Sequence, residues 1–207
     1  MDNQPKTEPE TIRVAGVILA AGAAARMGQP KLLLPWQGQP LIWHVVQTGL
    51  HAGLEPMVVV TGAGVQDLRA ALSGLPLQFA HNPDWQSGQS SSVRVGIQAL
   101  PRQVQSVIFL LGDQPFVSVE LLQALVQTYV RTRPQILAPF VAGKRSNPVL
   151  FDRVLFEAMC GLVGDAGARS LFAQVPPTPM PWLDERLSFD VDTPEDYRRL
   201  LEEFGSG

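Results

Sequence analysis

Short apolar runs alternate along the chain with longer stretches that carry apolar residues at helical spacing, and this alternation constrains the fold more than any other feature. The clearest strand is SVIFLLGD (106–113), because a nearly continuous apolar run is typical of a parallel strand buried on both faces. Expected strands occupy 13–20, 56–62, 77–82, 106–113 and 135–141, and expected helices 39–53, 65–74, 90–100, 117–132, 153–162 and 194–204, with a further helix after GDAGAR. The pattern predicts a single α/β domain with a mostly parallel, Rossmann-like sheet flanked by helices, and an inserted or appended element around 142–187.

The composition limits the classes of protein to which the chain can belong. Of 207 residues, 45% are hydrophobic and 17% charged, as in a globular domain, and the net charge of −3 gives no general attraction to nucleic acids. No apolar stretch approaches the roughly 20 residues of a membrane helix, and the polar start MDNQPKTEPETIR does not resemble a signal peptide. The lone Cys160 fits a reducing compartment. We expect a cytoplasmic protein without nucleic-acid or membrane partners, with a disordered tail at 1–11 and one domain over 12–204.

A loop of small residues follows the first expected strand in ILAAGAAARMGQPK (18–31). Glycine and alanine let the backbone approach a ligand closely, and successive N–H groups in such a turn can bind phosphate oxygens. Arg26 could add a forked contact and Lys31 a compact point charge. The loop matches neither the P-loop pattern GxxxxGK[ST] nor the dinucleotide pattern GxGxxG. From spacing alone, a phosphate-binding loop and a surface turn with two solvated cations are equally well supported.

The segment LAAGAAARMGQPKLLLPWQGQPL resembles the signature LAxGxSxRMGxxK of the nucleotidyltransferases that activate the molybdenum cofactor. The segments NPDWQSGQSSSVRVGI, LLGDQP, SNPVLF, GDAGARSL and DVDTPEDY follow in the same order, and the whole set is similar to the cytidylyltransferase branch. The resemblance implies a fold like that of the nucleotide-diphospho-sugar transferases and a loop that binds a nucleoside triphosphate. It implies charge neutralisation by Arg26 and Lys31, and backbone contacts from Leu19, Ala20, Ala21 and Gly22. This chain has Ala24 where the family often has serine.

Two carboxylate segments are candidates for a metal site. Asp113 directly follows the most apolar strand, where it could bind Mg²⁺ or begin an Asx turn. The resemblance implies the metal role, because the aspartate of LLGDQP stands where the family's metal-binding aspartate does. In FDVDTPEDY the resemblance implies Asp192 as the second ligand, with Asp190 in reserve. Capping of the last helix is the alternative role for Asp192.

The serines of SGQSSSVRVG lie at an expected helix start, where capping is the favoured role for at least one of them. In the resembling enzymes this segment lies near the nucleotide. The candidates for nucleotide binding are therefore Ser90 and Ser91, with Gln89, Ser92 and Arg94 behind them. Among the histidines, only His81 is a candidate, because it follows a strand near the expected ligand edge.

A basic turn in AGKRSNPVLF carries Lys144 and Arg145. The two residues could be solvated surface charges. Alternatively, they could bind the phosphate of an acceptor together with Arg169 of GDAGAR. The family more often has glycine where this chain has Ser146.

The expected function is a Mg²⁺-dependent transfer of CMP from CTP to the terminal phosphate of molybdopterin, with release of pyrophosphate. Arg26, Lys31 and Asp113 are the expected catalytic residues, and Asp113 and Asp192 the expected metal ligands. CTP is favoured because the guanylyl branch of the resembling family tends to read LAGG, which differs from this chain at Ala21. The expected partners are CTP, molybdopterin and a client molybdoenzyme or its maturation factor. Alternatives are a related transferase that uses GTP or another phosphorylated acceptor, and a non-catalytic carrier of the cofactor.

Overall fold

Parallel strands form the centre of the computed structural model, which describes residues 12–22, 30–62 and 64–205. β1 (Val14–Ala20) lies between β4 (Met57–Thr61) and β6 (Ser106–Leu111) and runs parallel to both. β5 (Gln78–His81) continues the sheet beyond β4, again in parallel. These four strands are among the five predicted from the apolar runs, and the fifth, at 135–141, is β7 (Ile136–Val141). Their carboxyl ends meet at one edge of the sheet, where ligands bind in folds of this kind.

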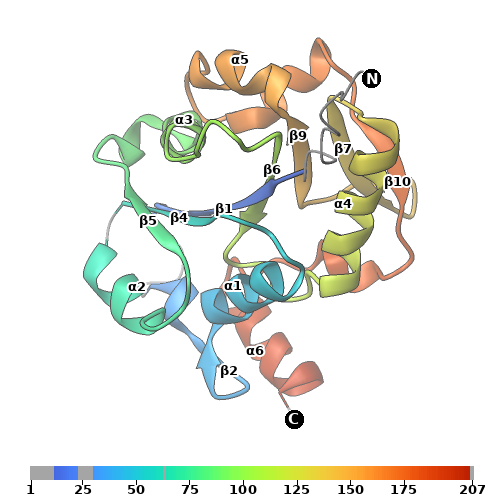
Figure 1. Ribbon diagram of the computed structural model, residues 1–207. Coiled ribbons are helices and arrows are strands. Elements are labelled where there is room, and N and C mark those ends of the chain that lie inside the picture. The colour runs from blue at the N-terminus through green and yellow to red at the C-terminus, as the bar shows by residue number, and fades with distance from the viewer. Residues whose placement is uncertain (1–11, 23–29, 63, 206–207) are drawn as a thin grey trace, which may run out of the picture.

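The chain after β6 builds the other half of the sheet. β9 (Val149–Asp152) lies between β6 and β7 (Ile136–Val141) and is antiparallel to both. β8 (Lys144–Arg145) pairs with β7 in the antiparallel sense, whereas β10 (Thr178–Pro181) pairs with it in parallel. Among the described residues the strand order is β10-β7-β9-β6-β1-β4-β5 (Figure 1), and β8 pairs with β7. The predicted fold class is confirmed, and the element expected around 142–187 supplies β8, β9 and β10.

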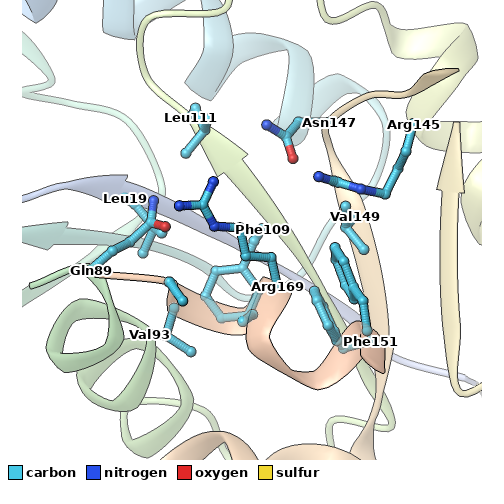
Figure 2. Close-up of a pocket in the computed structure, with 13 residues that line it drawn as sticks. Leu19, Gln89, Val93, Phe109, Leu111, Arg145, Asn147, Val149, Phe151 and Arg169 are labelled. Atoms are coloured by element: carbon cyan, nitrogen blue, oxygen red, sulfur yellow. The ribbon is translucent and has the colours of Figure 1, made fainter. Parts of the chain in front are cut away.

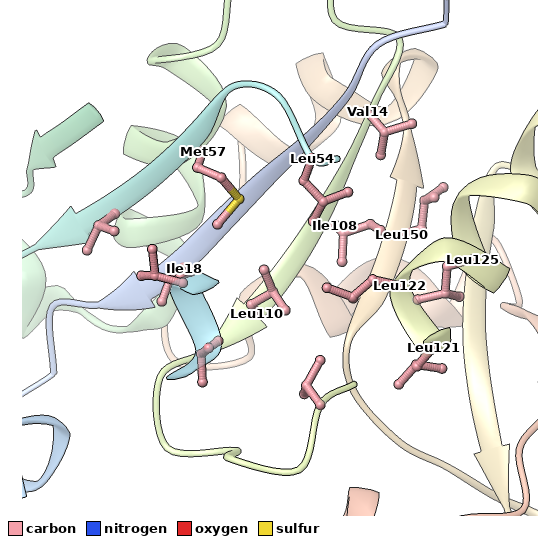
Figure 3. Packing of buried hydrophobic residues seen from close by; sticks show 14 of the residues in the cluster. Val14, Ile18, Leu54, Met57, Ile108, Leu110, Leu121, Leu122, Leu125 and Leu150 are labelled. Carbon is pink, nitrogen blue, oxygen red and sulfur yellow. The ribbon is translucent and has the colours of Figure 1, made fainter. Parts of the chain in front are cut away.

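Helices cover both faces of this sheet (Figure 1). α1 (Leu41–His51), α2 (Val65–Ala71) and α4 (Val119–Thr132) pack on one face, and α3 (Gln89–Gln98) and α5 (Phe156–Cys160) on the other. Because side chains alternate along a strand, Ile18 of β1 joins the first apolar cluster and Val17 joins the second. Figure 3 shows the first cluster, to which α4 contributes Leu121, Leu122 and Leu125. Burial on both sides holds β1 and β6 rigidly, and with them the loops at their carboxyl ends.

The start of α3 differs from the sequence prediction. Gly88 occupies the N-cap position with φ of +108°, and the three serines lie buried in the helix that follows. Glycine is needed there because L side chains rarely adopt this conformation, and an added Cβ would lie 2.5 Å from Oδ1 of Asp165. The expectation that a serine caps this helix is therefore wrong. Ser118, in contrast, caps α4 as predicted and accepts a hydrogen bond of 3.2 Å from the backbone N–H of Leu121.

The two helices expected between 153 and 173 are shorter and less regular than predicted. A 3₁₀ turn (Arg153–Leu155) precedes the five residues of α5, which ends at Gly161. The helix expected after GDAGAR begins within that segment, as a 3₁₀ helix (Gly167–Ala173) that packs against α3. The apolar periodicity predicted helical structure in these segments, but over so few residues it does not distinguish a 3₁₀ helix from an α-helix.

The C-terminal helix α6 (Pro194–Phe204) packs against a small hairpin of β2 (Pro35–Trp36) and β3 (Gln39–Pro40). Leu200 is fully buried beside Trp36 and Val191. The hydroxyl of Tyr197 donates a 2.7 Å hydrogen bond to the carbonyl of Pro35, which ties the helix to the chain just after the small-residue loop. Of the helices in the described parts of the chain, none combines the length and the apolar character needed to cross a membrane.

Candidate active site

A pocket of about 430 Å³ opens at the carboxyl edge of the parallel strands. The end of β1 and the residues after it supply one wall, and Gly112 and Asp113 after β6 supply another. Leu19, Ala20, Ala21 and Gly22, the four positions expected to contact a nucleotide through their backbone, all line it. Lys31 lines the same pocket, so the beginning and the end of the small-residue loop face one space. Arg26, the other expected catalytic cation, lies outside the described residues.

Lys31 lies between two carboxylates that are far from it in sequence. Its Nζ donates hydrogen bonds to Oδ2 of Asp113 at 2.5 Å and to Oδ1 of Asp192 at 2.7 Å. The Lys31 and Asp113 side chains are 21% and 17% exposed, whereas Asp192 is 49% exposed. Burial alone lowers the pKa of Lys31, but the two carboxylates outweigh it, and the pKa is raised above its usual value. Lys31 is therefore a firmly protonated cation at the mouth of the pocket.

The backbone brings Asp192 to this position. The N–H of Val191 donates a 3.0 Å hydrogen bond to the carbonyl of Asp113, so the segment before α6 lies against the end of β6. Thr193 is the N-cap of α6, and it forms a capping box with Asp196. The alternative role of Asp192 as the helix cap is thereby excluded, and its carboxylate is left free to contact Lys31. Oδ2 of Asp196 also accepts a hydrogen bond from the backbone N–H of Asp192.

Asp190 contacts a different partner. Its Oδ1 accepts a 2.6 Å hydrogen bond from Nε2 of Gln114, a side chain that is only 3% exposed. Although part of the Asp190 residue faces solvent, burial of the carboxylate raises its pKa, and the charges of Asp113 and Asp192 add to this effect. Gln114 was not a sequence candidate. Its only signal was its place directly after Asp113 at the end of the strand.

The donor set of Asp113 and Asp192 fits a Mg²⁺ ion. Both carboxylates contact one cation, the Lys31 ammonium, which stands where they could share a metal ion. Among the described residues, no group of three or more His, Cys, Asp or Glu side chains is arranged to hold a metal by itself. Two carboxylates suffice for Mg²⁺ in such sites, because it takes its other ligands from substrate phosphates and water.

A hydrogen-bonded network beside the pocket joins the loop after β5 to the first turn of α3. Nδ2 of the buried Asn82 donates to Oγ of Ser91 at 2.8 Å and to Oγ of Ser92 at 2.9 Å. Ser92 lines the pocket together with Gln89, whereas Ser90 and Ser91 do not. The hydroxyl of Ser91 instead donates to the carbonyl of Gly88 at 2.8 Å.

Sequence reasoning missed three residues on this side. Asn82 holds the loop before α3, and Trp85 and Asp165 line the pocket. Asn82 follows a strand directly, which was a usable signal. Asp165 lies in the segment GDAGAR between β9 and β10, in which only Arg169 was a candidate.

A second pocket of about 200 Å³ adjoins the first, and the two share Leu19, Gln89 and Leu111 as lining residues. Figure 2 shows Arg145 and Asn147 on one side of it and Arg169 on the other. Phe109, Val149 and Phe151 lie behind them. Of the basic-turn candidates, the structure thus brings Arg145 and Arg169 together, whereas Lys144 does not line either pocket. Arg94 and His81 line neither pocket.

The comparison with known families agrees with this geometry. Residues 16–178 match the family described as the MobA-like NTP transferase domain. The chain belongs to this family. Its match to the MobA-like domain begins in β1 and ends in β10, so it includes both pockets and all the sheet strands that surround them. The matched range ends before Asp192, which α6 brings to the site.

Two relatives align with this chain over most of its length. The chain is 36% identical over 203 residues to the nicotine blue oxidoreductase of Paenarthrobacter nicotinovorans, which covers 91% of this chain and 96% of that protein. It is 33% identical over 193 residues to the purine catabolism protein PucB of Bacillus subtilis, covering 88% and 93% of the two chains.

Solved structures share the fold. The crystal structure of Rv0371c from Mycobacterium tuberculosis has a TM-score of 0.83 at 28% identity, with 92% of this chain and 98% of that chain covered. Its complex with manganese has a TM-score of 0.76 at 27% identity, with the same coverage. A nucleotidyl transferase from Methanothermobacter, at 24% identity and a TM-score of 0.78 over 93% and 97% of the chains, shares the fold.

Proposed function

We propose that this MobA-like protein transfers CMP from CTP to the terminal phosphate of molybdopterin in the presence of Mg²⁺. The observation that carries the proposal is the contact of Lys31 with both Asp113 and Asp192 beside a pocket that residues 19–22 line. A cation and a pair of carboxylates at the end of such a loop suit a triphosphate and its metal ion. The choice of CTP and of molybdopterin rests on the sequence resemblance.

The reaction requires little covalent chemistry from the protein. An oxygen of the molybdopterin phosphate forms a bond to the α-phosphorus of CTP. The bond from that phosphorus to the α–β bridging oxygen breaks, and pyrophosphate leaves with the bridging oxygen and its electron pair. The attacking phosphate is already ionised at neutral pH, so no general base is needed. Catalysis then depends on positioning and on neutralisation of charge.

Each site residue has a defined part in this proposal. Backbone N–H groups of the loop after β1 bind the nucleotide, and Lys31 shifts from the carboxylates to the phosphates when CTP enters. Asp113 and Asp192 would hold Mg²⁺, which in that position supplies positive charge to the phosphates. The manganese complex of the Mycobacterium relative supports a divalent metal in this family. Arg26 is proposed to contact the phosphates as well.

The deciding experiment supplies molybdopterin and Mg²⁺ with CTP, GTP, ATP or UTP in turn and identifies the product by mass analysis. We expect the cytosine dinucleotide of molybdopterin and one equivalent of pyrophosphate with CTP. A guanine product would overturn the choice of CTP and leave the transferase in place. Tight binding of molybdopterin without release of pyrophosphate from any nucleotide would instead identify a carrier.

The name of the Paenarthrobacter relative makes an oxidoreductase the competing candidate. The sequence contains no GxGxxG pattern, which favours nucleotidyl transfer. Oxidation of NADH or NADPH by the purified protein, with no pyrophosphate formed in the first assay, would favour the competitor.

A further inference from the structure

Two arginines in the second pocket have no acidic partner among the residues that the structure describes. Arg145 comes from β8 and Arg169 from the 3₁₀ helix at 167–173, and their guanidinium groups extend toward the space beside Asn147 (Figure 2). Across the described residues, no carboxylate forms an ion pair with either of them.

The two positive charges act on each other. Both residues are exposed overall, but partial burial of the Arg145 guanidinium lowers its pKa, and the charge of Arg169 lowers it further. Placing two like charges in one pocket costs free energy in the unliganded protein. An anion bound between them would remove that cost. Because a guanidinium binds phosphate oxygens in a forked, two-point contact, a phosphate with two negative charges is the best-matched anion.

Aromatic rings line the pocket beneath the arginines. The Cζ atom of Arg145 lies 4.7 Å from the ring centroid of Phe172, so the ring supports the flat face of the guanidinium. Phe172 in turn stacks on Phe151, with ring centroids 6.2 Å apart and an interplanar angle of 12°. Phe109 meets Phe151 edge-on at 5.9 Å. Phe109 and Phe151 are 7% and 1% exposed, whereas Phe172 is partly exposed, so Phe172 is the ring that a flat ligand can contact.

We propose that the second pocket is the acceptor site, where Arg145 and Arg169 bind a phosphate monoester and Phe172 contacts a flat ring attached to it. This inference rests on the proposed function, since it assigns the second substrate of that reaction to a pocket. The shared lining residues Leu19, Gln89 and Leu111 place this pocket directly beside the nucleotide pocket. The acceptor phosphate and the α-phosphate of the nucleotide can therefore approach each other across that boundary.

Binding of small probes tests the pocket without any turnover. The intact protein is titrated with phenyl phosphate, which has a ring and a phosphate, and with methyl phosphate, which has only the phosphate. We expect phenyl phosphate to bind about tenfold more tightly. Replacing Arg145 or Arg169 by Gln should weaken phenyl phosphate binding by about tenfold or more, because each change removes one charge-assisted contact. NMR titration measures both affinities.

Lys144→Gln is the matched control, because Lys144 precedes Arg145 on the same strand and lines neither pocket. This variant should bind phenyl phosphate within about twofold of the wild type. Phe172→Leu should reduce the preference for phenyl over methyl phosphate while both still bind. Arginine variants that bind phenyl phosphate as tightly as the wild type would overturn the assignment, as would displacement of phenyl phosphate by CTP alone.

The experiments distinguish a wrong assignment of the acceptor site from a wrong proposed function. If CTP is used with molybdopterin but Arg145→Gln and Arg169→Gln keep the wild-type KM for the acceptor, the site assignment is wrong and the function stands. If phenyl phosphate binding depends on both arginines but no nucleotide is ever transferred, the proposed function is wrong and the anion site stands.

Discussion

Lys31 and Asp113 are 82 residues apart in the sequence, yet Nζ of the lysine lies 2.5 Å from Oδ2 of the aspartate. The ammonium also contacts Asp192, so the Lys31 side chain forms ion pairs with both proposed metal ligands. Lys31 cannot keep both contacts when a metal ion binds to the same two carboxylates. Lys31 and the metal therefore compete until the phosphates of a nucleotide draw the lysine away.

The competition predicts opposite effects of Lys31→Ala on two kinds of binding. Without nucleotide, the variant should bind Mn²⁺ at least about tenfold more tightly, because a cation next to both ligands is removed. With nucleotide, it should bind CTP more weakly and turn over more slowly, since the lysine charge serves ground and transition states alike. Electron paramagnetic resonance of free Mn²⁺ measures the first effect, and CTP-dependent pyrophosphate release measures the second.

Two further variants sharpen that test. Lys31→Arg should restore little activity, because a forked guanidinium does not replace a point charge. Lys144→Ala, an exposed lysine outside both pockets, should leave Mn²⁺ affinity at the wild-type value. Unchanged Mn²⁺ affinity in Lys31→Ala would show that the lysine does not compete with the metal.

Asp113→Asn should lower the rate of pyrophosphate release by about a hundredfold or more. The substitution keeps the shape of the side chain but removes the negative charge that would bind the metal. The protein should remain folded, because Asp113 is partly exposed and its backbone carbonyl still accepts the hydrogen bond from Val191. Circular dichroism checks the fold. Asp67→Asn, at an exposed position on α2, is the control that should keep wild-type activity. Wild-type turnover in a folded Asp113→Asn protein would remove Asp113 from the site.

Asp196 links the stability of α6 to the position of Asp192. Asp196→Ala removes half of the capping box and should lower the free energy of unfolding by about 1 kcal/mol. It also removes the acceptor for the backbone N–H of Asp192, so the turnover rate should fall as well. Denaturant unfolding and pyrophosphate release measure the two losses. Glu202→Ala, at an exposed position of the same helix, is the control.

Asp196 should also make the free energy of unfolding depend on pH. The hydrogen bond from the Thr193 side chain lowers the pKa of Asp196 below its unfolded-state value. Its contribution to stability is therefore present at neutral pH and is lost as the pH falls through the lowered pKa. The difference in unfolding free energy between wild type and Asp196→Ala should shrink below about pH 4. A difference that stays constant down to the acid transition would contradict this assignment of the pKa shift.

The sequence predicted the parts of the fold and site that follow from local pattern. The apolar runs located the parallel strands, and the run before Asp113 placed that residue at a strand end. Asn82 and Gln114 were not predicted as site residues. Each buried amide is defined by its hydrogen-bond partner in the fold, Ser91 and Asp190 respectively, and the sequence does not show these pairs.

Longer-range features were less accessible from sequence. The antiparallel β9 between β6 and β7 depends on pairing between segments that are distant in the chain, and no local pattern encodes it. The serine-rich start of α3 is a case where local preference misled: serine favours the N-cap, but the close approach of Asp165 requires a residue without Cβ at position 88. Only the folded chain brings these two segments together.

Ala21 is the residue on which the choice of base is proposed to depend. It is 3% exposed, lines the nucleotide pocket, and belongs to the apolar cluster that includes Val60 and Val93. Its carbonyl oxygen would lie 2.6 Å from a Cβ added to Gly62, so the backbone on its other side has no room to retreat. A methyl group in this wall should admit a pyrimidine more readily than a purine. Ala21→Gly should therefore raise the use of GTP relative to CTP.

The expected shift in that preference is about ten- to hundredfold at most, because steric exclusion by one methyl group is worth about 1–3 kcal/mol. The measurement is the ratio of kcat/KM for CTP to that for GTP in each protein. Since the ratio is taken within one protein, any general loss of stability or activity in the glycine variant cancels. A wild-type protein that already prefers GTP would end the cytidylyl assignment. An unchanged ratio in Ala21→Gly would leave that assignment in place and show that other residues of the pocket select the base. Asp165 is the next residue to test, because its carboxylate can accept a hydrogen bond from the amino group of cytosine.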